Sequence, residues 1–550
     1  PAPAAAAGEL ADSVAAAVDA TKPRSAEQRV TVVRVTPPPP IVETPEVQKL
    51  FAIGGYATAI LGQRFGLDGL LLLPLAAALA GGVALLVAPP MLKLASHYFA
   101  LASLAVAQLV LLAAINLEGL TGGANGLNEL PTLRLAGWTL EQGRPLTVAI
   151  WILATGCAIC FWLPGALPLL RRHILREAPL VAEATGLDAA RWRIAAFAFS
   201  AACAGLAGGL YVQASGVVAP DIAELAVMVN VLAMSVIGGR GRVTGALLGA
   251  LLLAFLPEAL RFLGGWQLFA WGAAMLLVLL AAPGGLAGLL ERFWPTATKT
   301  TPAPADAFEA PTPAALDARD LHKAFGGVAA LAGVSLRIGA GEIVAVIGPN
   351  GAGKTTLLNL LSGFVRADRG EILWRDLDLA KAPAHRRAHL GIGRAFQSDQ
   401  LPGDLQLTDA VAVATSERDL PAARARAMAV LQRLDLEQVA TAKLATLPPP
   451  TRRLADIARA MAGTPALLLL DEPTSGLAAS ERDLLAETLR RLRAQGLSLL
   501  LVEHDIGFIL SLADRIVCLG QGRIVADDAP AGLLARVELQ RFFGRWARRA

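Results

Sequence analysis

Eight consecutive residues in the second half of the chain have the types and spacing of a phosphate-binding loop. They fit the P-loop pattern GxxxxGK[ST] without a mismatch, and they are Gly348, Pro349, Asn350, Gly351, Ala352, Gly353, Lys354 and Thr355. Glycines let backbone N–H groups curl around phosphate oxygens, Lys354 neutralises the β- and γ-phosphate charge, and the Thr355 hydroxyl ligates Mg²⁺. The loop therefore predicts a nucleotide site, which we extend to Thr356.

The flanking sequence places this loop between a strand and a helix. An apolar run over residues 342 to 347 precedes the loop and is typical of a buried parallel strand, and residues 356 to 361 follow as the start of a helix. Phosphate binding requires this order, because the N-terminus of the helix points free N–H groups at the phosphate. A glycine-rich turn that binds nothing is the alternative, and this context argues against it.

Two acidic residues follow a second apolar run. The leucines at 467 to 470 predict a buried strand, and Asp471 and Glu472 come directly after it. Carboxylates at the C-terminal edge of such a strand stand where a P-loop fold needs a Mg²⁺ partner and a base that activates water. Two acids alone often end a strand at the surface, but the P-loop favours the catalytic interpretation. His504 follows a third apolar run, at 497 to 502, where a lone histidine is usually incidental.

The first half of the chain is too apolar for a soluble protein. Of 550 residues 55% are hydrophobic, the mean hydropathy is +0.53, and the excess lies before about residue 293. A helix needs about 20 apolar residues to cross a bilayer. Glycine pairs at 205 and 209 and at 245 and 249 have the spacing that allows close helix approach. We predict seven to eight spans, the first of them short, near residues 48 to 63, 70 to 90, 98 to 117, 146 to 164, 193 to 213, 223 to 239, 243 to 263 and 267 to 290.

Composition divides the chain into five parts. The first 45 residues contain Pro37 to Pro40 and lack the continuous apolar core of a signal peptide, so they resemble a linker or a trimmed fragment. We expect a low-complexity segment at 1 to 47, an all-α transmembrane domain at 48 to 293, a linker rich in proline, threonine and alanine at 294 to 315, an α/β domain of the P-loop NTPase class at 316 to 534 and a C-terminal tail at 535 to 550.

The distribution of basic residues predicts the orientation in the membrane. A nucleotide-using domain after the last span faces the cytoplasm, and counting back from it places the loops near Lys93, at 171 to 193 and at 240 to 242 on the cytoplasmic side. These loops are basic, whereas the long loop at 118 to 145 has only two arginines, as the positive-inside rule expects. We therefore expect an inner-membrane protein with a cytoplasmic nucleotide domain.

Charge and cysteine content argue against several classes of function. A net charge of +4 is small for this length, and no basic block is interleaved with aromatic residues, so we predict no nucleic-acid partner. Cys157 and Cys160 lie inside an apolar span without a second ligand pair, which favours helix packing over a metal or redox site. Asn230 is strongly polar inside a span, and we prefer an interhelical hydrogen bond over a role in a pathway.

The segments of the second domain together resemble the ATP-binding-cassette (ABC) family over nearly the whole domain. The resemblance implies ATP and Mg²⁺ as cofactors, Asp471 as a Mg²⁺ ligand, Glu472 as general base and His504 as a switch that reaches the γ-phosphate. Gln397, in the run Gly-Arg-Ala-Phe-Gln, corresponds to the residue that senses Mg²⁺ and touches the membrane domain. Phe325 corresponds to the aromatic residue that stacks on adenine. These segments are most similar to the ATPases of branched-chain amino acid uptake systems.

One segment departs from the family pattern. Where the family carries its LSGGQ-like signature, this chain has Leu447, three prolines at 448 to 450 and Thr451. The family signature offers a serine hydroxyl and a glycine N–H to the γ-phosphate on the opposite subunit, and proline has neither. Ala478 stands where many members have aspartate. We therefore expect a weak site at this signature and a partner ATPase with an intact one, in a heteromeric pair.

The membrane half resembles the branched-chain amino acid permease family from about residue 51 to 290. The segments that carry the resemblance lie at 51 to 56, 120 to 127, 182 to 187 and 238 to 249. The third resembles the coupling segment of ABC importers, a short helix that docks on the ATPase, and an ordinary amphipathic loop helix is the alternative. The family's earlier membrane segments have no counterpart in this sequence, so we expect part of the pathway to be missing or supplied otherwise.

These resemblances predict a permease fused to its ATPase, one half of an importer for branched-chain or related hydrophobic amino acids. The implied partners are a second permease, a second ATPase, an extracytoplasmic binding protein and membrane lipid. An exporter half-transporter is the first alternative, disfavoured by short spans and a compact coupling loop. A non-hydrolysing subunit that binds nucleotide structurally is the second; the prolines favour it, and intact Lys354, Asp471 and Glu472 argue against it. No residue discriminates branched-chain from other amino acids or small amides.

Overall fold

The structure is a computed structural model that describes most of both halves of the chain. The described residues are 46–92, 96–128, 134–135, 138–139, 156, 166–223, 225–239, 243–282, 285–288, 313–397 and 400–535. Several predictions concern residues outside these ranges, namely the N-terminal segment, the span near 146 to 164 with Cys157 and Cys160, Lys93, the basic residues 240 to 242, and most of the linker and tail.

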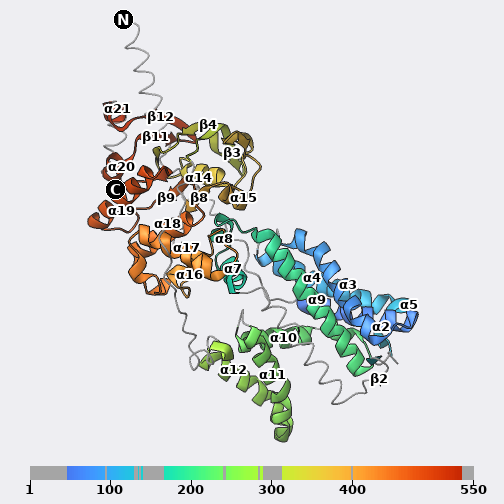
Figure 1. Cartoon of the computed structure of the whole chain (residues 1–550). Coiled ribbons are helices and arrows are strands. Elements are labelled where there is room, and N and C mark those ends of the chain that lie inside the picture. Colours follow the sequence, from blue (N-terminus) through green and yellow to red (C-terminus); the bar gives the residue numbers. More distant parts are fainter. Residues whose placement is uncertain are drawn as a thin grey trace, which may run out of the picture.

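Long apolar helices form the described membrane half. They are α2 (Glu46–Phe65), α3 (Gly69–Met91), α4 (Ser96–Asn116), α9 (Ala189–Ser215), α10 (Leu225–Gly238), α11 (Val243–Ala259) and α12 (Gln267–Ala281). Helix α9 packs along α2 and α3, and α10 packs on α11 (Figure 1). Each helix coincides with a predicted apolar run, because a helix satisfies every backbone polar group internally.

Fewer of these helices than predicted are long enough to cross a membrane. Among the described residues, two qualify by length and composition, Leu71–Met91 and Ala189–Ser215, and a third does if Leu104–Asn116 and Glu118–Asn125, which meet at 83°, form one broken span. Three further apolar helices are shorter, at Val229–Gly238, Thr244–Ala259 and Phe269–Val278. The predicted span at 243 to 263 is shorter because α11 ends at Ala259 and a 3₁₀ segment, η3 (Arg261–Trp266), follows with a non-helical Gly264.

Small residues bring the membrane helices into contact, as the two predicted glycine pairs require. A Cβ on Gly205 of α9 would lie 2.7 Å from the carbonyl oxygen of Ala76 on α3, and one on Gly249 of α11 would lie 1.9 Å from that of Met234 on α10. Backbones this close leave no room for a larger residue. Asn230 is exposed on α10, and the described part of the chain holds no hydrogen-bond partner for it, so the preferred interhelical hydrogen bond is not found there.

Short elements lie between α4 and α9 and directly after α9, at one end of the helix bundle. They are α5 (Glu118–Thr121), η1 (Gly123–Asn125), β1 (Arg134–Leu135), β2 (Trp138–Thr139) and, after α9, η2 (Pro220–Ala223). The N–H of Leu127 donates to the carbonyl of Val218 at 2.8 Å. A Cβ on Gly126 would lie 2.0 Å from the same oxygen. The glycines of the run 120 to 127 thus let this turn pack against the end of α9.

The second half of the chain folds around two sheets. The larger has the order β12-β11-β5-β10-β9-β8, parallel except for β12, and consists of β5 (Ile343–Ile347), β8 (Ile392–Ala395), β9 (Leu467–Asp471), β10 (Ser498–Val502), β11 (Arg515–Gly520) and β12 (Arg523–Asp528). The smaller is antiparallel with the order β4-β3-β6-β7, from β3 (Leu316–Phe325), β4 (Val328–Ile338), β6 (Arg369–Trp374) and β7 (Leu377–Asp378). The three apolar runs predicted as strands are β5, β9 and β10.

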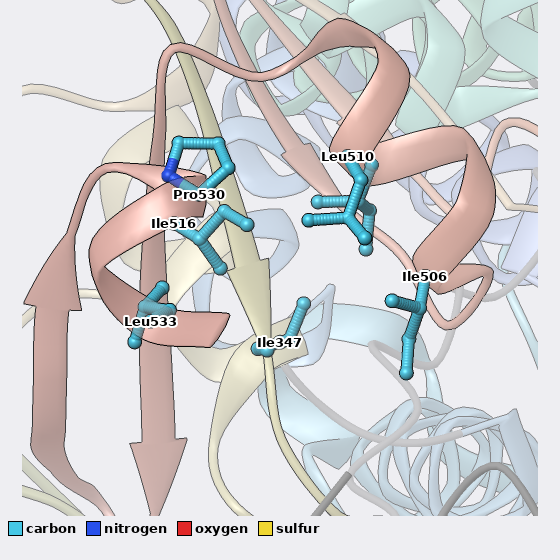
Figure 2. A pocket seen from close by; sticks show the side chains of 7 residues that line it. Ile347, Ile506, Leu510, Ile516, Pro530 and Leu533 are labelled. Atoms are coloured by element: carbon cyan, nitrogen blue, oxygen red, sulfur yellow. The ribbon is translucent and has the colours of Figure 1, made fainter. Parts of the chain in front are cut away.

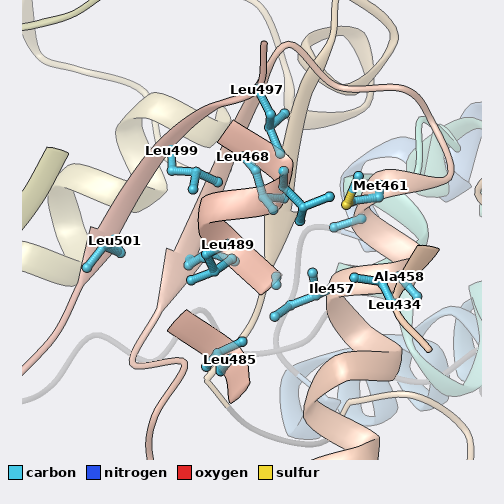
Figure 3. Close-up of a cluster of buried hydrophobic side chains, with 14 of the residues drawn as sticks. Leu434, Ile457, Ala458, Met461, Leu468, Leu485, Leu489, Leu497, Leu499 and Leu501 are labelled. Carbon is cyan, nitrogen blue, oxygen red and sulfur yellow. The ribbon is translucent and has the colours of Figure 1, made fainter. Parts of the chain in front are cut away.

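Helices pack against the sheets and enclose the hydrophobic core of the domain. They are α14 (Lys354–Ser362), α15 (Ala384–His389), α16 (Leu407–Ala412), α17 (Leu420–Arg433), α18 (Pro449–Met461), α19 (Ala479–Ala494), α20 (Ile506–Leu512) and α21 (Pro530–Ala535), with the 3₁₀ turns η4 (Glu437–Val439) and η5 (Leu444–Thr446). Figure 3 shows leucines of β9, β10 and α19 meeting Ile457 and Met461 of α18. This core fixes α18 against the strands whose ends carry the predicted acids.

Two helices of the first half of the chain pack against the second half. Figure 1 shows α7 (Ala166–Glu177) and α8 (Pro179–Ala184) lying between the membrane helices and the sheet domain. Leu167 of α7 is buried in the core of the sheet domain. Arg171 donates through Nη2 to the carbonyls of Thr415 and Glu417, both at 2.9 Å. The basic loop predicted to face the nucleotide domain therefore contacts it directly.

Candidate active site

The glycine-rich loop lies between β5 and α14, as its sequence predicts. Gly353 adopts φ +101°, and a Cβ there would lie 2.4 Å from the carbonyl oxygen of Ala330, so only glycine fits. Lys354 begins α14, and its buried ammonium donates to the carbonyls of Gly348 at 2.7 Å and Pro349 at 3.1 Å. Burial lowers the pKa of Lys354, an effect opposed by the charges of Glu472 and Asp471. The lysine therefore lies against the loop and within electrostatic reach of both acids.

The side chain of Glu472 contacts two other side chains predicted to be catalytic, those of His504 and Gln397. Its Oε1 lies 2.9 Å from Nε2 of His504, and its Oε2 accepts a hydrogen bond from the amide of Gln397. The bond to His504 is the leading cause that holds the pKa of Glu472 below its ordinary value. The backbone of Glu472 has φ +46°, which is strained for a residue with a side chain. The site therefore brings together residues that are up to 107 positions apart.

A buried carboxylate holds the two loops that carry this cluster. Glu503 accepts through Oε1 from the N–H of Thr474 at 2.7 Å and its hydroxyl at 2.6 Å. Through Oε2 it accepts from the N–H of His504 at 2.8 Å. Glu503 thereby ties the loop after β9 to the loop after β10, which fixes Glu472 opposite His504.

The candidate metal ligands are oxygen donors beside the glycine-rich loop. Asp471 ends β9, paired with Val502 of β10, and burial raises its pKa against the lowering effect of Arg394. Thr355 is the second residue of α14 and is exposed. Hydroxyl, carboxylate and amide oxygens suit Mg²⁺, which keeps waters and phosphate oxygens as further ligands. Accordingly, the described ranges contain no cluster of three His, Cys, Asp or Glu that could hold a metal alone.

The predicted adenine-stacking residue lies on the hairpin beside the loop. Phe325 ends β3, and the Nζ of Lys323 lies 5.3 Å from its ring centroid. The following strand, β4, brings Ala330 against Gly353. The hairpin thus borders the loop, while the stacking role of Phe325 stays a prediction, as do the individual roles of the other site residues.

The proline-rich segment forms the start of α18. This helix begins at Pro449, its N-cap is Pro448, and no side chain caps its first turn. Ala478 occupies the N-cap position of α19, and its N–H donates to Oε2 of Glu481 at 2.7 Å. Neither position offers a side-chain hydroxyl or carboxylate, which agrees with the departure seen in the sequence.

Two arginines that motif reasoning does not assign contact the site. Arg453 of α18 donates through Nε to the carbonyl of Pro473 at 3.2 Å, and through its other nitrogens to the carbonyls of Phe396 and Glu472. Arg394 lies in β8 and pairs with Asp471 at 3.5 Å. An arginine inside a short buried strand is an available signal, because a buried cation needs a partner. The contacts of Arg453 have no local signal, since they depend on how α18 packs.

The segment predicted to couple the halves docks beside the site. Val181 and Ala182 of α8 are buried in one cluster with Phe396, the neighbour of Gln397, and with Val413. A Cβ on Gly186, which has φ +90°, would lie 2.6 Å from the ring of His389 on α15. A short helix thus docks in the predicted region, but it runs from Pro179 to Ala184, so only residues 182 to 184 of the predicted 182 to 187 are helical, and its coupling role stays a prediction.

One pocket near the loop is apolar and contributes no ligand for phosphate. Figure 2 shows it between β5, β11, α20 and α21. Only hydrocarbon side chains line it, namely those of Ile347, Ile506, Ile509, Leu510, Ile516, Pro530 and Leu533. This pocket is therefore not a candidate for the phosphate site.

The fold and the site define an ATP-binding cassette that follows a helical membrane domain, and the chain belongs to the ABC transporter family. The ABC transporter family model matches residues 331–475. The model of the branched-chain amino acid transport system/permease component matches residues 47–283. The cassette is an ATP hydrolase of the ABC type, and the chain combines it with a permease domain.

Similar curated proteins match the cassette half. The ATP-binding protein BraF for high-affinity branched-chain amino acid transport, from Pseudomonas aeruginosa, is 33% identical over 236 residues, covering 39% of this chain and 91% of that protein. LivG from Escherichia coli, also an ATP-binding protein for high-affinity branched-chain amino acid transport, is 34% identical over 233 residues, covering 39% of this chain and 91% of that protein. LptB, the ATP-binding protein of the lipopolysaccharide export system of Escherichia coli, is 33% identical over 233 residues, covering 42% and 97%. Among solved structures, a nucleotide-free ATP-binding cassette from an ABC transporter is 25% identical and covers 42% of this chain and 98% of that chain, with a TM-score of 0.39.

Proposed function

We propose that this chain is one fused half of an inner-membrane importer for branched-chain or related hydrophobic amino acids. The observation that carries the proposal is the match of residues 47–283 to the branched-chain permease family in the same chain as the cassette. The cassette alone does not decide the matter, because relatives named for branched-chain amino acid transport and for lipopolysaccharide export match it about equally well. The proposed domains are the five segments defined from composition, with the cassette at 316 to 534 in the cytoplasm.

The proposed chemistry is hydrolysis of ATP, in which water attacks the γ-phosphorus, the bond from this atom to the bridging oxygen of the β-phosphate breaks, and ADP leaves with phosphate as the other product. Glu472 accepts the proton of the attacking water, while His504 and Gln397 hold its carboxylate through the bonds described above. Lys354 and the glycine-rich loop bind the β- and γ-phosphates, and Phe325 stacks on adenine. Thr355, Asp471 and Gln397 would hold Mg²⁺, which when bound neutralises charge on the phosphates.

The proposed coupling runs through α8, because this helix packs on Phe396 next to Gln397. Closure of two cassettes would move this surface and turn the attached permease helices. Because Pro448 and Pro449 offer neither hydroxyl nor N–H, the proposed partner ATPase brings an intact signature to the loop of this chain. A second permease and an extracytoplasmic binding protein complete the proposed assembly.

Substrate and direction are tested in vesicles of defined orientation. The chain is reconstituted with its partner subunits, and ATP-dependent movement of radiolabelled leucine is measured with ATP supplied on the cassette side. The proposal expects leucine to move toward the cassette side, in a manner that depends on the binding protein and is competed by isoleucine and valine. Movement away from the cassette side would support the exporter alternative. Movement of another amino acid or of urea, without leucine, would overturn the substrate assignment.

A further inference from the structure

A buried arginine in β8 has no role in the chemistry proposed above. Arg394 is 5% exposed, and all four residues of β8 are buried. Strand β8 pairs in parallel with β9, with Arg394 opposite Leu469, two residues before Asp471. Burying a guanidinium is costly unless its charge and its donors are matched. The hydrogen-bond and charge partners of Arg394 therefore indicate its role.

The donors of Arg394 connect the P-loop helix to the candidate Mg²⁺ ligand. Its Nη1 donates to Oδ1 of Asn359 at 2.7 Å and to Oγ of Ser362 at 2.6 Å, both on α14. Its Nη2 lies 3.5 Å from Oδ2 of Asp471, the only ion pair that the described residues give it. The guanidinium is thus bound to α14 through Nη1 and reaches Asp471 through Nη2.

The same guanidinium lies against the surface that receives α8. Its central carbon lies 5.4 Å from the ring centroid of Phe364 and 5.1 Å from that of Phe396. The two rings are tilted against each other with centroids 5.7 Å apart. Both pack in the cluster that contains Val181 and Ala182 of α8. Arg394 therefore lies beside two rings of the docking surface and reaches Asp471 through Nη2.

We propose that Arg394 is a positioning residue that links the docking of α8 to the orientation of the Asp471 carboxylate. With α8 docked, Phe364 and Phe396 hold the guanidinium in the plane from which Nη2 reaches Asp471. Displacement of α8 moves the rings, and the arginine then no longer holds the carboxylate in the orientation that Mg²⁺ requires. The inference rests on the proposed function, because it takes Asp471 to be a Mg²⁺ ligand.

A purely structural role is the competing explanation, and the chain contains a matched control for it. Arg387 of α15 is also buried, and its nitrogens donate only to carbonyls, those of Leu360, Leu361, Leu379 and Ala382. It ties α15 to the end of α14 and makes no hydrogen bond or ion pair with Asp471. Loss of Arg387 therefore reports what removal of a buried arginine does to the fold alone.

The test measures Mg²⁺-dependent nucleotide binding by the full chain in lipid nanodiscs. A fluorescent ATP analogue is titrated in EDTA and then across Mg²⁺ concentrations, for the wild type, Arg394→Met, Arg394→Lys and Arg387→Met. We expect the Mg²⁺ concentration for half-maximal enhancement to rise about tenfold in Arg394→Met, because removing a group that orients a metal ligand weakens metal binding by about 10- to 100-fold. Binding in EDTA should be unchanged. Arg387→Met should lower the melting temperature and leave the Mg²⁺ midpoint as in the wild type.

A second arm tests the link to α8. Gly186→Val, which drives a side chain into His389, should shift the Mg²⁺ midpoint in the wild-type background and should add nothing to Arg394→Met, because coupled residues are not additive. A wild-type-like midpoint in folded Arg394→Met would overturn the proposal, as would fully additive shifts. Where Arg394→Met is not recovered folded, Arg394→Lys decides, since lysine keeps the charge but cannot bond α14 and reach Asp471 together. A wild type without Mg²⁺ dependence would instead contradict the proposed function.

Discussion

The imidazole Nε2 of His504 lies 2.9 Å from Oε1 of Glu472, across the ends of the parallel strands β9 and β10. Each residue follows a run of leucines, so neither strand alone identifies its partner. Their contact depends on the pairing of the two strands and on Glu503, which binds both loops. The candidate base of the cassette is therefore oriented by the sheet itself.

This contact predicts a pH dependence of stability. Because the bond to His504 leads the causes that lower the pKa of Glu472, the folded chain binds that proton less tightly than the unfolded chain. The resulting stabilisation is complete above the ordinary glutamate pKa and is lost as pH falls through the lowered folded value. We expect His504→Ala to lower the melting temperature at neutral pH and the difference from wild type to shrink below about pH 4. Thermal unfolding in detergent measures it, and a difference that grows on acidification would contradict the assignment.

Docking of α8 predicts a variant that separates hydrolysis from transport. In Gly186→Val the side chain would enter the ring of His389, and valine at φ +90° is strained. At saturating Mg²⁺ we expect leucine transport per ATP hydrolysed to fall by about tenfold or more, while nucleotide binding in EDTA is retained. Gly119→Ala is the matched control, because no atom lies within 4 Å of a Cβ there. Equal transport stoichiometry in Gly186→Val and wild type would show that this contact does not couple the halves.

Helix packing in the membrane half predicts where side chains are not tolerated. Gly249→Val places a side chain against the carbonyl of Met234, so α10 and α11 must separate. We expect a loss of about 1–3 kcal/mol or more in the free energy of unfolding, seen as a lower melting temperature and poorer recovery from detergent. Gly272→Ala on α12, where a Cβ meets nothing within 4 Å, should behave as wild type. Recovery of Gly249→Val at wild-type stability would contradict the packing.

Restoring polar and N–H groups in the signature segment is predicted to raise the rate of ATP hydrolysis by the chain alone. Pro448→Ser supplies a hydroxyl N-cap to α18, which is worth about 1 kcal/mol of helix stability, and Pro449→Gly adds an N–H. We expect the double variant to hydrolyse ATP without a partner, at a rate at least about tenfold above that of the unaltered chain alone. The same variant carrying Glu472→Gln is the control and should show no such rate. An unchanged rate would mean that Pro448 and Pro449 are not what limits hydrolysis by the chain alone.

Local sequence was sufficient for the parts of the site that are contiguous in the chain. The P-loop with its strand and helix and the acids after β9 each follow from a run of a few residues. The membrane helices were also predicted from their apolar runs, although their lengths were not: α11 ends at Ala259, and a 3₁₀ segment with a non-helical Gly264 follows it. Proline at 448 to 450 marked the altered signature directly.

Contacts between distant segments could not be predicted in this way. Arg394 and Asp471 are 77 residues apart, and their proximity arises only from the pairing of β8 with β9. The bonds of Arg453 to the carbonyls of Phe396 and Glu472 depend on how α18 packs on the sheet. The docking of Leu167 and Arg171 of α7 on the cassette likewise has no local signal beyond an amphipathic pattern.

The most direct measurement is the ATPase rate of the full chain in proteoliposomes, alone and with a partner ATPase that carries an intact signature. Each preparation is compared with its Glu472→Gln counterpart. The account predicts hydrolysis that appears only with the partner and is lost in Glu472→Gln, because one complete site forms at the P-loop of this chain. Equal, Glu472-dependent hydrolysis by the chain alone would contradict the heteromeric asymmetry. Absence of Glu472-dependent hydrolysis with any partner would contradict the assignment of Glu472 as the base.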